Sequence, residues 1–330
     1  MTGGVASLPI APPRRRRLSR LVEAWGQEIV IAAAILVLGA VVGSVNPRFL
    51  SESNLNSLFS GNAYIAVAAI GMSMVIIARH IDVSVGSLIG VLATVAGTLA
   101  VAGYPVWLAW TVPVVLGVLL NALVGGIIAY MRIPSIVVTL GMLSILKGGL
   151  ISVTGGAWIT GMPEAFFIAR ARLFGIPSPV YFMVVLTVLV ALWMRYSAVG
   201  RSIYAVGGNP EAARAAGLSP ERTCVLVFAL HGFFAGIAAL LFATQLQVIQ
   251  STVPPNLELT VITASVIGGV SILGGTGTVV GSTLAAILFA CIGSSLIFLN
   301  VSAYWLRAVL GLMILATVLA DMARRRRAIG

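Results

Sequence analysis

Few residues of this chain could carry chemistry, and they are widely separated. Asp82 and Glu258 lie at the edges of apolar segments, while Lys147 and His231 lie within them. An ionised group costs free energy in apolar surroundings unless it is paired or hydrated. These four residues are therefore either parts of a polar pathway or paired structural groups.

Each of the four has a structural interpretation beside the functional one. For Asp82 we favour capping of the helix that follows, with Arg79 as counter-charge, over a direct role in transport. Glu258 follows "VPPN" and can likewise cap a helix at the outer face. Lys147 either lines an aqueous pathway or extends toward an interface, and both remain open. His231 fits a satisfied packing histidine better than a proton relay.

The remaining residues do not form a pattern that is typical of an enzyme, a metal site or a cofactor site. Two distant histidines and the isolated Cys224 and Cys291 do not form a metal-ligand pattern. We see no nucleophile–base pair and no GxxxxGK[ST] loop; Lys147, the one lysine, lacks a following Ser or Thr. We expect no enzyme, metal site or bound cofactor, and any ATP that is used must be hydrolysed by another chain.

Uncharged polar residues in the apolar segments could line a route for a hydroxyl-rich solute. Hydrogen bonds between helices are the commoner fate of such residues. The pathway candidates are Asn62, Asp82, Ser84, Asn121, Lys147, Gln245 and Thr263, with Ser73, Thr139, Ser144, Thr244, Gln247 and Thr260 as further possibilities.

The composition sets these residues in a membrane. The 330 residues are 59% hydrophobic and 9% charged, against about 25% charged residues in soluble domains. About 20 apolar residues cross a bilayer as a helix. We predict an all-α polytopic protein with ten spans: 29–45, 61–78, 84–103, 106–130, 133–153, 179–195, 223–248, 258–273, 277–299 and 304–322. In the region 258–299, a re-entrant hairpin could replace two full spans.

The arginines predict the orientation of these spans. Nine lie at the two ends of the chain, and six more lie in connections on the same side under this topology, whereas three lie in connections on the other. Cytoplasmic segments carry this excess, and anionic lipid attracts it. We expect a multi-pass protein of the bacterial inner membrane with both termini cytoplasmic, no cleaved signal peptide and no nucleic-acid partner. The tails cover 1–28 and 323–330, and one transmembrane domain covers 29–322.

Pairs of glycine four residues apart recur in the predicted spans. Such pairs let helix backbones approach closely. Sliding surfaces and static packing both fit the pairs, which are Gly86 and Gly90, Gly232 and Gly236, and Gly277 and Gly281.

The connection 196–222 carries two short polar helices with clear start and stop signals. Asn209 is a good N-cap before Pro210, with Glu211 in the first turn. Gly217 ends this helix, and "SPE" at 219–221 begins another that runs into the next span. A rigid helix pair on a span suits docking to a partner, although a capped connector without a partner fits the same signals.

Three motifs in order resemble the ribose-type sugar permeases of ABC importers. They are "IDVSVGSLIGV" (81–91), "GRSIYAVGGNPEAARAAGLS" (200–219), which contains an EAA-type coupling motif, and "VIGGVSILGGTGTVVG" (266–281). Within that family, "RHIDVSVGS", "TGGAWITGMP" and "SAYW" look most like autoinducer-2 import permeases and next like rhamnose permeases. The family usually has Gly-Gly where this chain has Arg79 and His80, which makes ribose less fitting.

The resemblance implies a type II ABC importer-like permease whose partners supply energy and selectivity. A separate ATPase would dock on Asn209, Pro210, Glu211, Ala212, Ala213, Arg214 and Gly217. A periplasmic solute-binding protein would face Trp158, 162–167 and 249–257, and a second permease, identical or related, would complete the transporter. The solute would be autoinducer-2, rhamnose or ribose. An ion-coupled carrier or channel is the alternative, with a membrane enzyme third.

Overall fold

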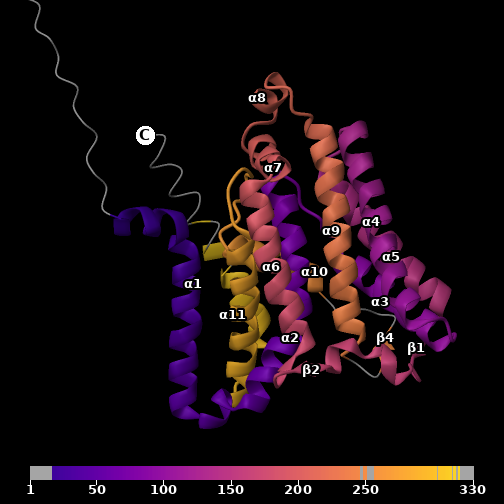
Figure 1. Cartoon of the computed structure of the whole chain (residues 1–330), viewed down its shortest axis with the longest axis vertical. Helices are drawn as coiled ribbons and strands as arrows, with labels where there is room; N and C mark the ends of the chain where they lie inside the picture. The colour runs from indigo at the N-terminus through magenta and orange to yellow at the C-terminus, as the bar shows by residue number, and fades with distance from the viewer. Residues whose placement is uncertain are drawn as a thin grey trace, which may run out of the picture.

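The protein is a bundle of roughly parallel helices (Figure 1). The computed structural model describes residues 17–245, 248–250, 256–302, 304–313, 315, 316 and 319. The helices are α1 Arg17–Val45, α2 Glu52–Ile77, α3 Val85–Val101, α4 Val106–Met131, α5 Ser135–Thr154, α6 Ser178–Tyr196, α7 Ala198–Gly208, α8 Pro210–Ala215, α9 Pro220–Ala243, α10 Leu257–Ile267 and α11 Val279–Phe298. The strands are β1 Trp158–Ile159, β2 Arg172–Leu173, β3 Ile176–Pro177 and β4 Ile249–Gln250.

Seven described helices are long and apolar enough to cross a membrane, and the all-α, multi-pass prediction is confirmed. They are α1 from Trp25 onward, α2, α4, α5, α6, α9 and α11. Of the predicted tenth span, residues 305–313 are helical. The rest of that span lies largely outside the described residues, as do the tail 323–330, the first 16 residues and Gln247.

The predicted full span at 258–273 is wrong. Its helix, α10, has 11 residues, about 16 Å, or about half of the hydrocarbon thickness. The loop after it contains Gly269, Gly274 and Gly275 with positive φ, a conformation that ends a helix. The region is thus a hairpin with one short arm, α10, and one full-length arm, α11. Helix α3, with 17 residues, is also short.

Helix α1 begins earlier than the predicted boundary at residue 29. It starts at Arg17 and bends at Trp25, whose φ and ψ of −131° and 16° are not helical. The membrane-length part runs from Trp25 to Val45 and lies along α11. Gln27 donates a hydrogen bond to the Ile267 carbonyl, and Thr278 donates one to Glu28. Polar groups therefore fix α1 to both ends of the α10–α11 loop.

Helix α9 lies at the centre of the bundle and packs against α2, α3 and α4. Gly232 faces the Gly117 carbonyl and Gly236 faces Val114, so α9 and α4 are in backbone contact there. Gly281 on α11 meets the Gly268 carbonyl in the same way. All three glycines thus lie where two backbones approach closely. Gly90 is buried in α3, and Gly277, at φ +136°, lies in the α10–α11 loop against Val270.

Two short pairs of strands lie at the end of the bundle opposite α8 (Figure 1). β1 pairs antiparallel with β4, so that Trp158 lies opposite Gln250. β2 pairs with β3. The two connections that we expected to face a solute-binding protein are thereby joined at one face of the molecule. We call the two ends of the bundle the α8 face and the β1 face.

Candidate functional site: a capped helix pair and a buried polar centre

Helix α8 projects from one end of the bundle (Figure 1). The Asn209 side chain accepts hydrogen bonds from the backbone N–H groups of Glu211 (3.1 Å) and Ala212 (3.0 Å). At the other end, Gly217 has φ +84°, its N–H bonds the Arg214 carbonyl, and Leu218 N–H bonds the Ala213 carbonyl. This is a Schellman motif, which satisfies the last carbonyls of the helix. Both ends of α8 are therefore fixed by local hydrogen bonds.

The second helix of the pair continues into the bundle. The Ser219 hydroxyl accepts from Arg222 N–H and caps α9, which runs without a break to Ala243. Arg214 on α8 forms an ion pair with Glu221 on α9. Of the expected docking residues, Glu211, Ala212 and Arg214 are exposed, whereas Ala213 is buried. Helix α8 is thus joined to the central helix α9 by an ion pair as well as by the short connection between them.

Helix α7 was not predicted and forms the base of this pair. Ser197 caps it by accepting from Gly200 N–H. Three glycines in the 11 residues, at 200, 207 and 208, weaken its helical signal. The N-cap Ser197 was the signal that could have revealed it.

Asp82 lies at the centre of a buried polar cluster. Its Oδ1 accepts hydrogen bonds from Ser84 N–H (2.8 Å) and the Ser84 hydroxyl (2.5 Å), and its Oδ2 accepts from the Asn121 amide (3.2 Å). His231 Nε2 on α9 lies 3.6 Å from the same Oδ2. The structure thus brings together three of the expected pathway residues and adds His231. All four side chains are buried.

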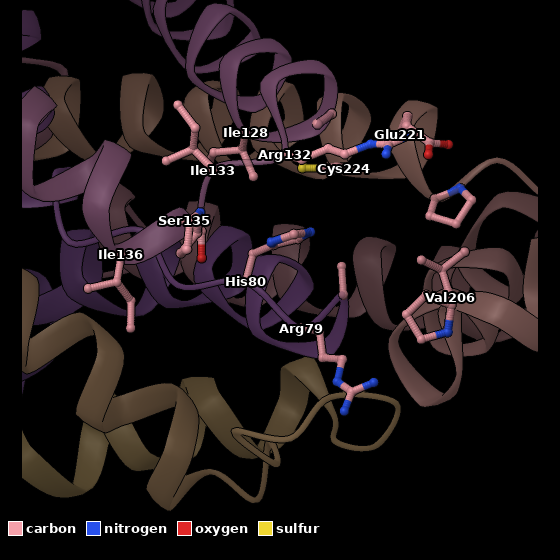
Figure 2. A pocket seen from close by; sticks show the side chains of 15 residues that line it. Arg79, His80, Ile128, Arg132, Ile133, Ser135, Ile136, Val206, Glu221 and Cys224 are labelled. Carbon is pink, nitrogen blue, oxygen red and sulfur yellow. The ribbon is translucent and has the colours of Figure 1, made fainter.

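The two expectations about charge in this cluster are corrected. Arg79 is not the counter-charge of Asp82, because its side chain extends toward Gly274 (Figure 2). The backbone of Arg79 has a positive φ of +75°. His231 is not a satisfied packing histidine either, since neither ring nitrogen hydrogen-bonds to any residue that the structure describes.

The other pathway candidates lie elsewhere. Asn62 donates to the Leu58 carbonyl, and Thr263 is buried on α10. Lys147 is on the exposed side of α5, next to Ser144 and Gly148. Glu258 lies in the first turn of α10, beside Gly86 of α3.

Gln245 borders a polar cavity of about 310 Å³ near the β1 face. Its amide donates to the Ser60 carbonyl at 2.6 Å. Amides, hydroxyls and guanidinium groups surround this cavity, whose lining includes Asn56, Ser57, Ser60, Arg170 and Arg172.

A larger cavity, of about 490 Å³, lies at the base of α8. Figure 2 shows His80 pointing into it, with Arg132, Cys224 and Glu221 on the far side. Burial lowers the pKa of His80, in the connection between α2 and α3, to about 4. The imidazole is therefore neutral near pH 7, and the cavity joins the α2–α3 and α4–α5 connections to the helix pair.

A model of the family described as branched-chain amino acid transport system / permease component matches residues 53–318. The chain belongs to this permease family. It is 36% identical over 296 residues to the autoinducer 2 import system permease protein LsrC of Salmonella typhi, covering 89% of this chain and 85% of that protein. It is 34% identical to the LsrC protein of Escherichia coli O9:H4 (strain HS), covering 89% and 86%. No solved structure shows significant similarity.

As a member of this family, the chain is a permease subunit of a transport system. The sequence match covers the helix pair, the Asp82 cluster and both cavities. Among the described residues, no group of three or more His, Cys, Asp or Glu side chains is placed to hold a metal ion. The candidate functional features of the permease are therefore the buried Asp82 cluster and the projecting helix α8.

Proposed function

We propose that this permease imports a sugar-like solute, with autoinducer-2 the best candidate, and that a separate ATPase drives it by docking on α8. The observation that carries the proposal is helix α8, which is capped at both ends and is linked to the central helix α9 by a short connection and an ion pair. A transport subunit without a nucleotide-binding loop can be driven by ATP only through such a contact. The names of the relatives support autoinducer-2 as the solute, and rhamnose and ribose are the next candidates.

The distribution of arginine supports a cytoplasmic α8 face. Arg132, Arg201 and Arg214 lie in the connections at this end, while Arg170 and Arg172 lie with β2 at the other. Positive charge is enriched on cytoplasmic connections. The β1 face would then meet a periplasmic solute-binding protein, and its polar cavity beside Gln245 offers the amides and hydroxyls that a hydroxyl-rich solute requires.

Lys147 supports a second permease copy beside α5. An ammonium facing lipid at this depth is costly, and the small neighbours Ser144 and Gly148 would allow another helix to approach closely. In the pair, Lys147 would face the partner or a hydrated space between the subunits. An identical and a related partner fit equally.

Docking is tested by reversing the charge at Glu211, which is exposed in the first turn of α8. With Glu211→Lys, co-purification of the ATPase in detergent and solute uptake should both fall, because the helix start no longer carries its favourable charge. Glu164→Lys on the β1 face is the matched control and should leave ATPase binding unchanged. Equal binding by both variants would refute α8 as the docking helix.

An ion-coupled carrier is the second candidate, and the Asp82–His231 pair favours it. Buried titratable pairs mark ion pathways in many carriers. This alternative predicts uptake by the permease alone in vesicles, driven by an ion gradient and abolished by Asp82→Asn. Uptake that requires ATP and the ATPase, and persists when the ion gradient is collapsed, would exclude it.

A further inference from the structure

Three segments that are distant in sequence meet at the base of α8. They are the end of α2 at Ile77, the end of α7 at Gly207 and Gly208, and the loop between α10 and α11 at Gly274 and Gly275. Gly275 N–H donates a hydrogen bond to the Ile77 carbonyl at 2.8 Å. The Tyr204 hydroxyl on α7 donates one to the Gly277 carbonyl at 2.9 Å.

Glycine is required at this meeting point because the backbones touch. A Cβ on Gly207 would overlap the Ile77 carbonyl, and one on Gly275 would lie 2.6 Å from Gly208 Cα. Gly274 and Gly275 also have φ of +79° and +76°. We call Tyr204, Gly207, Gly274, Gly275 and Ile77 the α7 junction.

In this junction, α7 contacts the end of α2 and the α10–α11 loop, and each of these two segments is connected to one of the short helices, α3 and α10. The end of α2 leads through 78–84 into α3, and the loop at Gly274 follows α10 directly. The starts of α3 and α10 then meet inside the bundle, where a Cβ on Gly86 would lie 3.0 Å from Glu258 N. The entry into α3 is held by Asp82 through Ser84 and Asn121.

We propose that the α7 junction positions both short helices for transport by linking them to α8. Asn209 follows α7 immediately, so that a displacement of α8 moves α7. Through the backbone contacts of the junction, it also moves the segment 78–84 before α3 and the loop after α10. Movement of α8 would thus change the contact between Gly86 and Glu258. This inference rests on the proposed docking of an ATPase at α8.

Two neighbouring glycines provide the test. Gly207→Ala places a methyl group against the Ile77 carbonyl, whereas the nearest atom to a Cβ on Gly208 is Gly275 Cα at 4.0 Å. Alanine raises helix propensity equally at both positions of α7, so the difference between the variants reports the junction. The complete transporter, with its ATPase and binding protein in proteoliposomes, is assayed for ATPase co-purification, ATP hydrolysis and solute imported per ATP hydrolysed.

Gly207→Ala should keep the ATPase bound and active but lower the solute imported per ATP by about tenfold, a typical coupling between sites. Gly208→Ala should behave as wild type. Wild-type stoichiometry in Gly207→Ala would overturn the inference. Loss of ATPase binding in Gly207→Ala, with binding retained in Gly208→Ala, would also overturn it, because the junction would then serve docking and not transmission.

A gentler variant covers the case in which Gly207→Ala does not fold. Tyr204→Phe removes only the hydroxyl that bonds the Gly277 carbonyl, and Tyr130→Phe, on the exposed side of α4, is its control. Tyr204→Phe should lower the solute imported per ATP while ATP hydrolysis continues. Equal stoichiometry in both phenylalanine variants contradicts the inference. Unchanged ATPase binding in Glu211→Lys would instead count against the proposed docking on α8, whatever the stoichiometry of the phenylalanine variants.

Discussion

The Asp82 cluster shows how one carboxylate can be kept in a membrane protein's interior. Three hydrogen bonds, from Ser84 and Asn121, replace water around it. The sequence marked Asp82, Ser84 and Asn121 as polar residues in apolar surroundings, but it could not pair them. Asp82 and Asn121 are 39 residues apart, and only the packing of α3 against α4 and α9 brings His231 to them.

At this scale we predict that Asn121→Ala destabilises the protein. The Asp82 carboxylate would lose a buried donor, which costs about 1–3 kcal/mol. The midpoint of thermal unfolding in detergent should fall clearly. Asn56→Ala, at the polar surface cavity, should shift it little. An unchanged midpoint for Asn121→Ala would mean that water replaces the amide.

His80 predicts a pH dependence of stability. Its pKa is about 4 in the folded protein and about 6.5 when unfolded, so the unfolded chain binds the proton more readily. Stability from this group is complete above pH 6.5 and is lost as pH falls toward 4. His80→Gln should flatten the fall in the unfolding midpoint over this range. Arg79, Arg132 and Glu221 border the same cavity and are retained in both proteins.

Helix ends were the most predictable elements and helix lengths the least. The caps at Asn209 and Ser219 and the stop at Gly217 follow from local chemistry, and the structure has all three. The end of α10 is also local: Gly269 has φ +93°, its N–H donates to the Val266 carbonyl, and Val270 N–H donates to the Ser265 carbonyl. The apolar residues that follow this glycine stop led to the longer predicted span at 258–273.

Removal of the Asn209 cap should loosen α8 without unfolding the bundle. Asn209→Ala leaves the N–H groups of Glu211 and Ala212 without their acceptor, at a cost of about 1 kcal/mol. Hydrogen exchange at these two amides should therefore quicken by about fivefold. Asn209→Asp keeps an acceptor and should exchange as wild type does. Unchanged exchange in Asn209→Ala would show that α8 does not depend on its cap.

The whole molecule presents apolar side chains outward and polar ones at its two ends. Val115, Leu119 and Leu123 form a stripe on α4, each more than half exposed, as lipid contact requires. Composition predicted this arrangement. It did not reveal that the strand pair β1–β4 joins two distant connections, because the pairing involves only two residues on each side.

The orientation of the whole molecule is open to a labelling test. Ala216→Cys at the end of α8 should react with a membrane-impermeant maleimide only after cells are opened. Glu164→Cys on the β1 face should react in intact cells. Ala216 is preferable to Ala213, which is buried. Labelling of Ala216→Cys from outside would invert the orientation and remove the basis for an ATPase on α8.

The shortness of α10 has an electrical consequence. Its first turn begins with no side-chain cap from Asn256, about 16 Å from the end of the helix near the α8 face. Acyl chains cannot hydrogen-bond the free N–H groups of such a helix start, so the place must be lined by protein or wetted. Glu258 lies in this first turn beside Gly86 of α3, so its negative charge complements the free N–H groups and the positive end of the helix dipole.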